Sequence, residues 1–258
     1  MAWQLRARFP RLRINVITRH GELLEHEPSI GEINAPPTLL LLTFWYPALV
    51  EHKASRGSIM DETSRELGGL PLGYRARIVL TAEERAWGLA QVRGLPGIRV
   101  AFNTKSKEIV KDWPEDRWAV VLRELGGRGI SMVQLGDDRE PVFPGVTRLA
   151  GRLTLRESMA VLAATQLHLG PDSFLMHAAN GLDVPSVIIF GGSRPAACLG
   201  YAGNENLDVV IDCGPCWLHS SKGESCPHAL ACLRMIDPAQ VVAAADRLLA
   251  RGRVTAGT

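Results

Sequence analysis

The sequence predicts an α/β protein built on a parallel, doubly wound sheet, and three observations carry this prediction. From about residue 95 onward, short apolar runs alternate with longer amphipathic segments, as strands joined by single crossover helices do. Glycine, proline and polar residues bound the apolar runs. Hydrophobic residues make up 46% of the 258 residues, which is enough to bury one large core or two modest ones.

Residues 1–94 are predicted to form a smaller, incomplete α/β domain. The first helix and strand resemble the second half of a β-α-β unit whose first strand is absent. Thr81 and Glu84 have the spacing of a helix capping box, and a Gly-Leu-Pro-Gly turn closes this part. We expect helices over residues 3–9, 22–27, 58–67 and 81–92, and strands over 13–18 and 39–45.

Residues 95–258 are predicted to form the second and complete domain. Its strands are expected over residues 98–103, 130–135, 167–169 and 184–190. Its helices are expected over 115–125, 154–164, a short segment around Met176, and 238–250.

The stretch 167–193 concentrates polar and glycine-rich residues where two neighbouring strands are expected to end. In an open α/β sheet ligands bind at that edge, and Asp172 and Ser173 would lie at a helix N-terminus, which favours a phosphate. Taken singly, each feature is more often structural than functional: Asp172 as a helix cap, Lys111 as a solvated surface lysine, residues 137–138 as a polar turn, and His177 as a hydrogen-bonded core histidine. Their coincidence at one edge favours a nucleotide-bearing ligand, with these candidate residues: Asn103, Thr104, Lys111, Asp137, Asp138, Asp172, Ser173, His177 and Gly191.

Composition excludes several other classes of protein. The net charge of +2 gives no basic stripe of the kind that marks nucleic-acid binding. No apolar run has the length of a membrane span, and the first residues lack the pattern of a signal peptide. A cytoplasmic protein is therefore expected.

Three motifs in residues 98–258 resemble glycosyltransferase family 9, the ADP-heptose heptosyltransferases of lipopolysaccharide synthesis and protein heptosylation. The region 149–195 resembles the family's signature, with Asp-Ser followed by Met-His and an apolar strand. Lys-x-Trp-Pro at 111–114, preceded by Asn-Thr at 103–104, matches a second motif, and Cys-x-Pro-Cys at 213–216 matches a third. The resemblance implies a GT-B-like fold of two Rossmann-like domains, with the donor in the C-terminal one and the N-terminal one truncated.

By the same resemblance, Asp172, Ser173, Phe174 and Leu175 would bind the donor's diphosphate and sugar. Lys111 and Thr104 would hold phosphate oxygens, and the turn at 137–138 would lie near the nucleoside. Phe174 stands where the family usually has glycine, which narrows the room for close backbone approach. The implied donor is ADP-heptose, and the acceptor is a lipopolysaccharide core, a protein or another glycan.

Catalysis is where the sequence departs most from the family. Inversion at the anomeric carbon needs a general base for the acceptor hydroxyl, and the family supplies an aspartate from a loop after the first strand. That loop is expected to precede residue 1 of this chain. Asp61, Glu51 and His52 are the available groups in the first part, and Asp61 is a weak candidate.

Four cysteines lie close together near the end of the second part. Cys213, Cys216, Cys226 and Cys232 have a spacing able to supply four thiolates to one tetrahedral metal, and His228 could replace one of them. Free thiols or a redox pair are the alternatives. Zinc is the chemical default, and the resemblance makes iron an equal candidate. The metal would be structural, with none expected for the transfer step.

Three hypotheses follow for the function. The first is an inverting heptosyltransferase, and the second is a donor-binding but inactive partner or fragment of such an enzyme. A dinucleotide oxidoreductase is disfavoured, because no Gly-x-Gly-x-x-Gly follows a first strand. An incomplete first sheet would expose an edge and could pair with another subunit.

Overall fold

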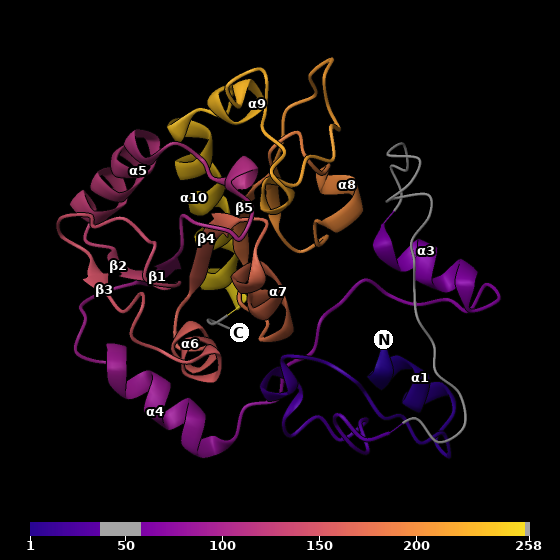
Figure 1. Ribbon diagram of the computed structural model, residues 1–258. Coiled ribbons are helices and arrows are strands. Elements are labelled where there is room, and N and C mark those ends of the chain that lie inside the picture. The colour runs from indigo at the N-terminus through magenta and orange to yellow at the C-terminus, as the bar shows by residue number, and fades with distance from the viewer. Residues whose placement is uncertain (37–57, 256–258) are drawn as a thin grey trace.

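The computed structural model describes residues 1–36 and 58–255, and its centre is a six-stranded parallel sheet (Figure 1). The strand order is β3-β2-β1-β4-β5-β6, so the chain starts in the middle of the sheet, builds one half, and returns to build the other. The predicted α/β class and parallel sheet are confirmed. The strands are β1 (Arg99–Phe102), β2 (Ser131–Gln134), β3 (Thr147–Arg148), β4 (Leu167–Pro171), β5 (Ser186–Ile189) and β6 (Glu205–Leu207).

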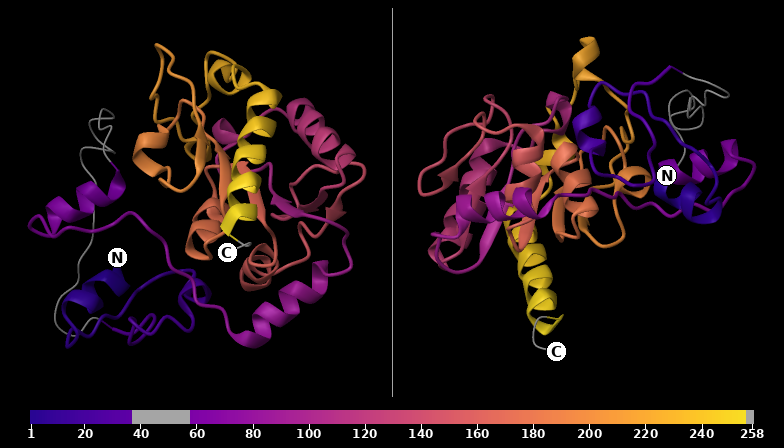
Figure 2. Two further views of the ribbon diagram at one scale, coloured as in Figure 1. Left: turned by 180° about the vertical axis from the view of Figure 1, so that it is seen from behind. Right: turned by 90° about the horizontal axis from the view of Figure 1, so that it is seen from below.

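Helices cover both faces of the sheet, as its buried strands require (Figures 1 and 2). Because side chains alternate along a strand, Val100 and Phe102 of β1 pack on one face and Ala101 on the other. The first face is covered by α5 (Glu115–Gly127) and α10 (Pro238–Thr255). The second is covered by α4 (Ala82–Val92), α6 (Leu155–Leu162) and α7 (Phe174–Gly181).

Helix α4 packs closely on α6. It begins at the predicted capping box, in which Thr81 and Glu84 bond each other's backbone N–H groups. A Cβ atom on Gly88 would lie 2.1 Å from the carbonyl oxygen of Ala160, so only glycine allows this approach. The helix is thus a layer of the sheet domain, although residues 81–92 precede the division expected at residue 94.

Outside the sheet domain, the described N-terminal residues form helices and irregular chain. They are α1 (Ala2–Arg8), the 3-10 helix η1 (Gly21–Leu24) and α3 (Ile59–Glu66). The strand predicted over 13–18 is wrong, because only Val16 forms a bridge, with Ile33. The neighbouring Arg13 instead pairs with Glu32, 2.7 Å apart. The strand predicted over 39–45, with Glu51 and His52, lies outside the described residues.

Arg156 of α6 joins the N-terminal part to the sheet domain. Its guanidinium donates to the carboxylate of Glu84 on α4, to the backbone oxygen of Glu22 at 2.9 Å, and to that of Val79 at 3.0 Å. The hydrogen bond from Arg156 is the main reason that the pKa of Glu84 falls to about 2. One side chain therefore holds three segments of the chain together.

Short helices complete the fold around the C-terminal half. They are η2 (Ile109–Lys111), α8 (Ala196–Leu199), η3 (Ser220–Lys222) and α9 (Ala231–Arg234). Within residues 1–36 and 58–255, no helix is both long and apolar enough to cross a membrane.

Candidate functional site

The candidate site lies where β1 and β4 end side by side, at the point where the strand order reverses. Asn103 follows β1, and Asp172 and Ser173 follow β4. The side-chain amide of Asn103 donates to the hydroxyl of Ser173 at 3.3 Å and so joins the two strand ends. The structure therefore brings together residues that are 70 positions apart in the sequence.

Lys111 reaches this point from η2 and pairs with Asp172. Its Nζ atom lies 2.5 Å from Oδ2 of Asp172 and 3.3 Å from the Asp172 backbone oxygen. Both side chains are buried, with 10% and 6% of their surfaces exposed. Burial lowers the pKa of Lys111, Arg194 lowers it further, and Asp172 opposes the fall. The surface-lysine alternative is thereby excluded for Lys111.

A buried histidine and a glycine fix the position of Asn103. The Oδ1 atom of Asn103 lies 3.0 Å from Nε2 of His168, and since Oδ1 only accepts, the histidine nitrogen donates. Complete burial lowers the pKa of His168 to about 3, so the ring is neutral at physiological pH. A Cβ atom on Gly170 would lie 2.5 Å from Oδ1 of Asn103, so glycine is required beside this pair.

Thr104 is oriented toward Glu140, a residue that the sequence analysis missed. The Thr104 hydroxyl donates to Oε2 of Glu140 at 2.7 Å, and its backbone N–H donates to the same carboxylate. The N–H of Lys105 adds a bond of 3.0 Å. Burial raises the pKa of Glu140 while these bonds oppose the rise. The only sequence signal for Glu140 was an acid in the loop after β2.

The N-terminus of α7 points its first backbone N–H groups toward the same edge. Ser173 is the N-cap residue, but its side chain makes no capping hydrogen bond. The side chain of Leu175 is buried in the core with α6, and that of Phe174 is partly buried against the same core, so their backbone N–H groups are the main groups available for a ligand at this edge. His177 is partly buried one turn further on, and its Nδ1 lies 2.9 Å from the hydroxyl of Tyr201.

Two other predicted residues lie apart from the Lys111–Asp172 pair. Asp137 is half exposed and forms a salt bridge with Arg139 at 2.6 Å. Asp61 accepts the backbone N–H of Ser58 at 2.8 Å, within the capping box of α3. The predicted residue Gly191 packs between the η2 turn and α9.

Glu108 fastens the cysteine-containing segment to the turn that carries Lys111. Its carboxylate accepts the hydroxyl of Ser220 at 3.0 Å and both the hydroxyl and the N–H of Ser221, at 2.5 and 2.9 Å. Its backbone oxygen accepts the N–H of Lys111 at 2.9 Å. Burial would raise the pKa of Glu108, but the hydrogen bonds outweigh it and lower the pKa to about 2.

The cysteine group is not assembled as the four-thiolate site that its spacing predicted. Cys213 is exposed, Cys216 and Cys226 are partly buried, and Cys232 is buried. The sulfur of Cys232 accepts the N–H of Gly192 at 3.1 Å and packs in the core. In the part of the chain that the structure describes, no three cysteine, histidine or acidic side chains are grouped as metal ligands.

Two curated relatives match part of the chain. Lipopolysaccharide heptosyltransferase 3 of Escherichia coli is 28% identical over 106 residues, covering 36% of this chain and 31% of that protein. Lipopolysaccharide heptosyltransferase 1 of Pseudomonas aeruginosa is 30% identical over 119 residues, covering 42% of this chain and 33% of that protein. The matched region thus spans about a third of the length of each relative.

Solved structures share the fold over almost the whole chain. The iron-containing dodecameric glycosyltransferase TibC from enterotoxigenic E. coli superposes with a TM-score of 0.74 and 19% identity, covering 96% of this chain and 70% of that one. The ADP-heptose heptosyltransferase II of E. coli superposes with a TM-score of 0.63 and 15% identity, covering 98% and 94%. These likenesses confirm the predicted GT-B-like fold class.

The match to a family model covers the candidate site and helix α4. The family described as glycosyltransferase family 9 (heptosyltransferase) matches residues 75–221, which is more than half of the chain. Since the matched range contains both strand ends, Lys111 and Asp172, the site and the sequence similarity coincide. The chain therefore belongs to glycosyltransferase family 9.

Proposed function

We propose that this chain binds a nucleotide-diphosphate sugar, ADP-heptose, at the ends of β1 and β4 and transfers the heptose with inversion to a glycan or protein acceptor. The observation that carries the proposal is the buried pair of Lys111 and Asp172 beside the uncapped N-terminus of α7. A lysine and the free N–H groups of a helix are two recurring protein ligands for phosphate.

The chemistry of the donor explains why a buried lysine is useful at this place. The acceptor oxygen forms a bond to the anomeric carbon, the bond from that carbon to the diphosphate breaks, and the acceptor proton passes to a base. ADP then leaves with additional negative charge, which the ammonium group of Lys111 would stabilise. Because Lys111 is held away from bulk water, its interaction with the leaving diphosphate is screened less than it would be on the surface.

The donor subsites are assigned as part of this proposal. The hydrogen bond between Asn103 and Ser173 would hold the ends of β1 and β4 together. The backbone N–H groups of Phe174 and Leu175 would face the diphosphate. Glu140 would hold Thr104 and Lys105 in place, which gives Thr104 a supporting role in addition to the phosphate contact implied by the family resemblance.

A second function is favoured by the position of Asp61. This candidate base is engaged in the capping box of α3 and is paired with the Ser58 backbone. A chain that binds the donor but lacks a base would serve as an inactive partner of a complete enzyme. The two functions differ in turnover and not in donor binding.

The test is calorimetric titration of ADP into the full-length chain and its variants. We expect Lys111→Ala to weaken ADP binding by about tenfold to hundredfold, the range for losing a charge-assisted hydrogen bond. Lys107→Ala is the matched control, because Lys107 is exposed in the same loop, and it should bind ADP as the wild type does. Equal affinity of Lys111→Ala and wild type would refute the site.

Turnover is measured separately, with ADP-heptose and candidate acceptors. ADP release that depends on the acceptor supports the transferase. Tight ADP binding without acceptor-dependent release supports the inactive partner.

A structural metal at the cysteine group, iron or zinc, also stays a proposal. It is supported by four cysteines within twenty residues and by the similarity of the fold to an iron-containing glycosyltransferase. In the described residues the thiols do not form a ligand group, so binding would require the segment 213–232 to rearrange. Elemental analysis of purified protein, with Cys213→Ser and Cys226→Ser as comparisons, tests the proposal, and metal-free, stable protein would count against it.

A further inference from the structure

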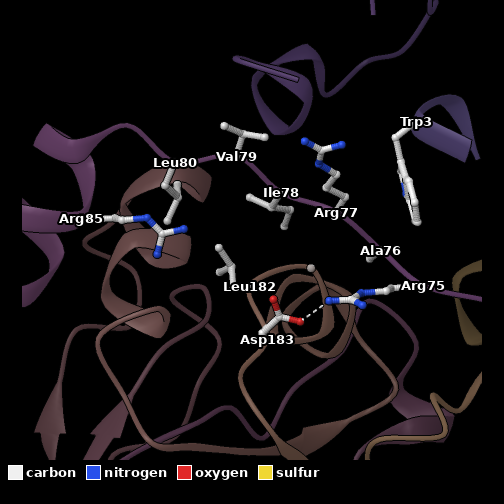
Figure 3. A pocket seen from close by; sticks show the side chains of 11 residues that line it. Trp3, Arg75, Ala76, Arg77, Ile78, Val79, Leu80, Arg85, Leu182 and Asp183 are labelled. Carbon is white, nitrogen blue, oxygen red and sulfur yellow. Dashed lines mark hydrogen bonds and ion pairs between the residues drawn. The ribbon is translucent and has the colours of Figure 1, made fainter. Parts of the chain in front are cut away.

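A cavity lies at the C-terminal end of α7, where Gly181 and the turn after it contribute to the lining (Figure 3). Its volume is about 470 Å³, within the range of small-molecule pockets. Helix α7 has eight residues, so its two ends are separated by about 12 Å. The cavity is lined by α1, the extended segment 75–80, the start of α4 and the turn after α7, and it shares no lining residue with the candidate donor site.

The lining of this cavity carries more positive than negative charge. Three arginines, Arg75, Arg77 and Arg85, and one acid, Asp183, contribute side chains, so the lining carries three positive charges against one negative charge. Arg75 pairs with Asp183 at 2.6 Å, but both side chains are more than half exposed, so this pair can open at little cost. The Nε atom of Arg77 lies 3.4 Å from Oε2 of Glu27, and Glu27 does not line the cavity.

Arg85 and Trp3 carry side-chain donors with no acceptor among the described residues; the Arg85 side chain is exposed to solvent and the Trp3 Nε1 atom is buried. Among the residues that the structure describes, Arg85 has neither an ion-pair partner nor a side-chain hydrogen bond. The indole Nε1 of Trp3 is buried and likewise has no acceptor in this part of the chain. Buried donors are normally satisfied, so the unpaired indole N–H is a donor that a ligand with an acceptor would satisfy.

The backbone walls of the cavity are fixed independently of any ligand. Ala76 donates its N–H to the side chain of Asn180 at 2.8 Å, and Ile78 donates to the backbone oxygen of Gly181 at 3.1 Å. A Cβ atom on Gly181 would lie 3.0 Å from the Ile78 side chain, so the segment packs directly on the end of α7. A ligand would therefore meet a pre-formed wall and would order mainly arginine side chains.

We infer that this cavity is a second, anion-binding site that takes a small phosphorylated molecule. The guanidinium group of Arg85 would hold the phosphate, because its planar donors match phosphate oxygens. Arg75, on the other side of Ile78 and Leu182 in Figure 3, would contact the organic part. Trp3 would contact the organic part, and its N–H would find an acceptor there. The site is separate from the donor site and does not depend on the proposed transferase activity.

The test is calorimetric titration of inorganic pyrophosphate, and in parallel of glucose 6-phosphate, into the full-length chain saturated with ADP. Saturation with ADP keeps the probes out of the donor site. We expect binding to the wild type, about tenfold weaker binding to Arg85→Ala, and a larger loss in the Arg75→Ala/Arg85→Ala variant. Trp3→Phe should weaken the binding of glucose 6-phosphate more than that of pyrophosphate, since it keeps an aromatic ring but removes the indole N–H.

Arg93→Ala is the matched control, because Arg93 is exposed at the end of the same helix and does not line the cavity. Failure of both probes to bind, or equal loss in Arg85→Ala and Arg93→Ala, would overturn the inference. If the wild type fails to bind ADP, the donor proposal fails by itself, and the same titrations in Lys111→Ala still test this cavity. Circular dichroism of each variant confirms that it is folded.

Discussion

The Nζ atom of Lys111 lies 2.5 Å from Oδ2 of Asp172, and this buried pair joins the η2 turn to the end of β4. Breaking one half of such a pair leaves the other charge buried without compensation. We expect Asp172→Asn to lower the free energy of unfolding by about 3 kcal/mol or more. The double variant Lys111→Met/Asp172→Asn should lose less than the sum of the two single variants, as measured by urea unfolding. Additive losses would show that the pair is not coupled.

The same variant should respond to pH in a defined direction. Asp172 opposes the fall in the pKa of Lys111, so Asp172→Asn lowers that pKa further below 10.5. The unfolded chain then binds the proton more readily than the folded chain does, and stability rises with pH. Relative to wild type, Asp172→Asn should therefore regain stability between pH 7 and the ordinary pKa of lysine. Parallel pH profiles of the two proteins would contradict this.

Gly170 is the position where added volume would act directly on the site. Its Cβ atom would lie 2.5 Å from Asn103 Oδ1 and 2.9 Å from the His168 ring. We expect Gly170→Ala to cost about 1–3 kcal/mol of stability, the range for overpacking a core, and to weaken ADP binding by displacing Asn103. Gly126→Ala is the control, because nothing lies within 4 Å of its Cβ in α5. That substitution should be neutral or slightly stabilising in urea unfolding.

The lowered pKa of Glu108 predicts that the folded protein loses stability in acid. Its pKa is lowered from 4.5 to about 2, so its stabilisation is complete above pH 4.5 and is lost as the pH falls toward 2. At pH 7, Glu108→Gln should be less stable than wild type by about 1–3 kcal/mol, because Ser220 and Ser221 lose a charged acceptor. The difference should shrink toward pH 2 in urea unfolding series. Glu124→Gln, at an exposed pair on α5, should change stability by less than about 1 kcal/mol at any pH.

The central strands could be predicted from the sequence because buried strands are rich in apolar residues. The strands β1, β2, β4 and β5 are short, buried and mostly apolar, and each lies within or overlaps its predicted range. The outer strands β3 and β6 were missed, since two or three residues such as Thr147 and Arg148 carry no pattern and are ordered by pairing with their neighbours. The strand predicted over 13–18 had the pattern but lacks a sheet to join in the described residues.

The residues of the site were predictable where they follow central strands, and not where they lie in loops. Lys111 and Asp172 were both placed near strand ends, and the parallel sheet brings those ends together. The direction of a side chain in a loop depends on tertiary contacts, which the sequence does not display. For this reason Glu140, and not Asp137, is the acid that reaches β1, and Asp61 is held in a helix cap.

The strand order has a consequence for how the protein folds. Asn103 and Ser173 belong to halves of the sheet that are built separately along the chain, and 70 positions separate them. Such a non-local contact forms only after the entropy of closing the intervening loop has been overcome. A ligand that spans the two strand ends binds the joined sheet and not its separate halves, so it shifts the folding equilibrium toward completion. Nucleotide added during refolding would thus favour the chain in which the two halves of the sheet are joined.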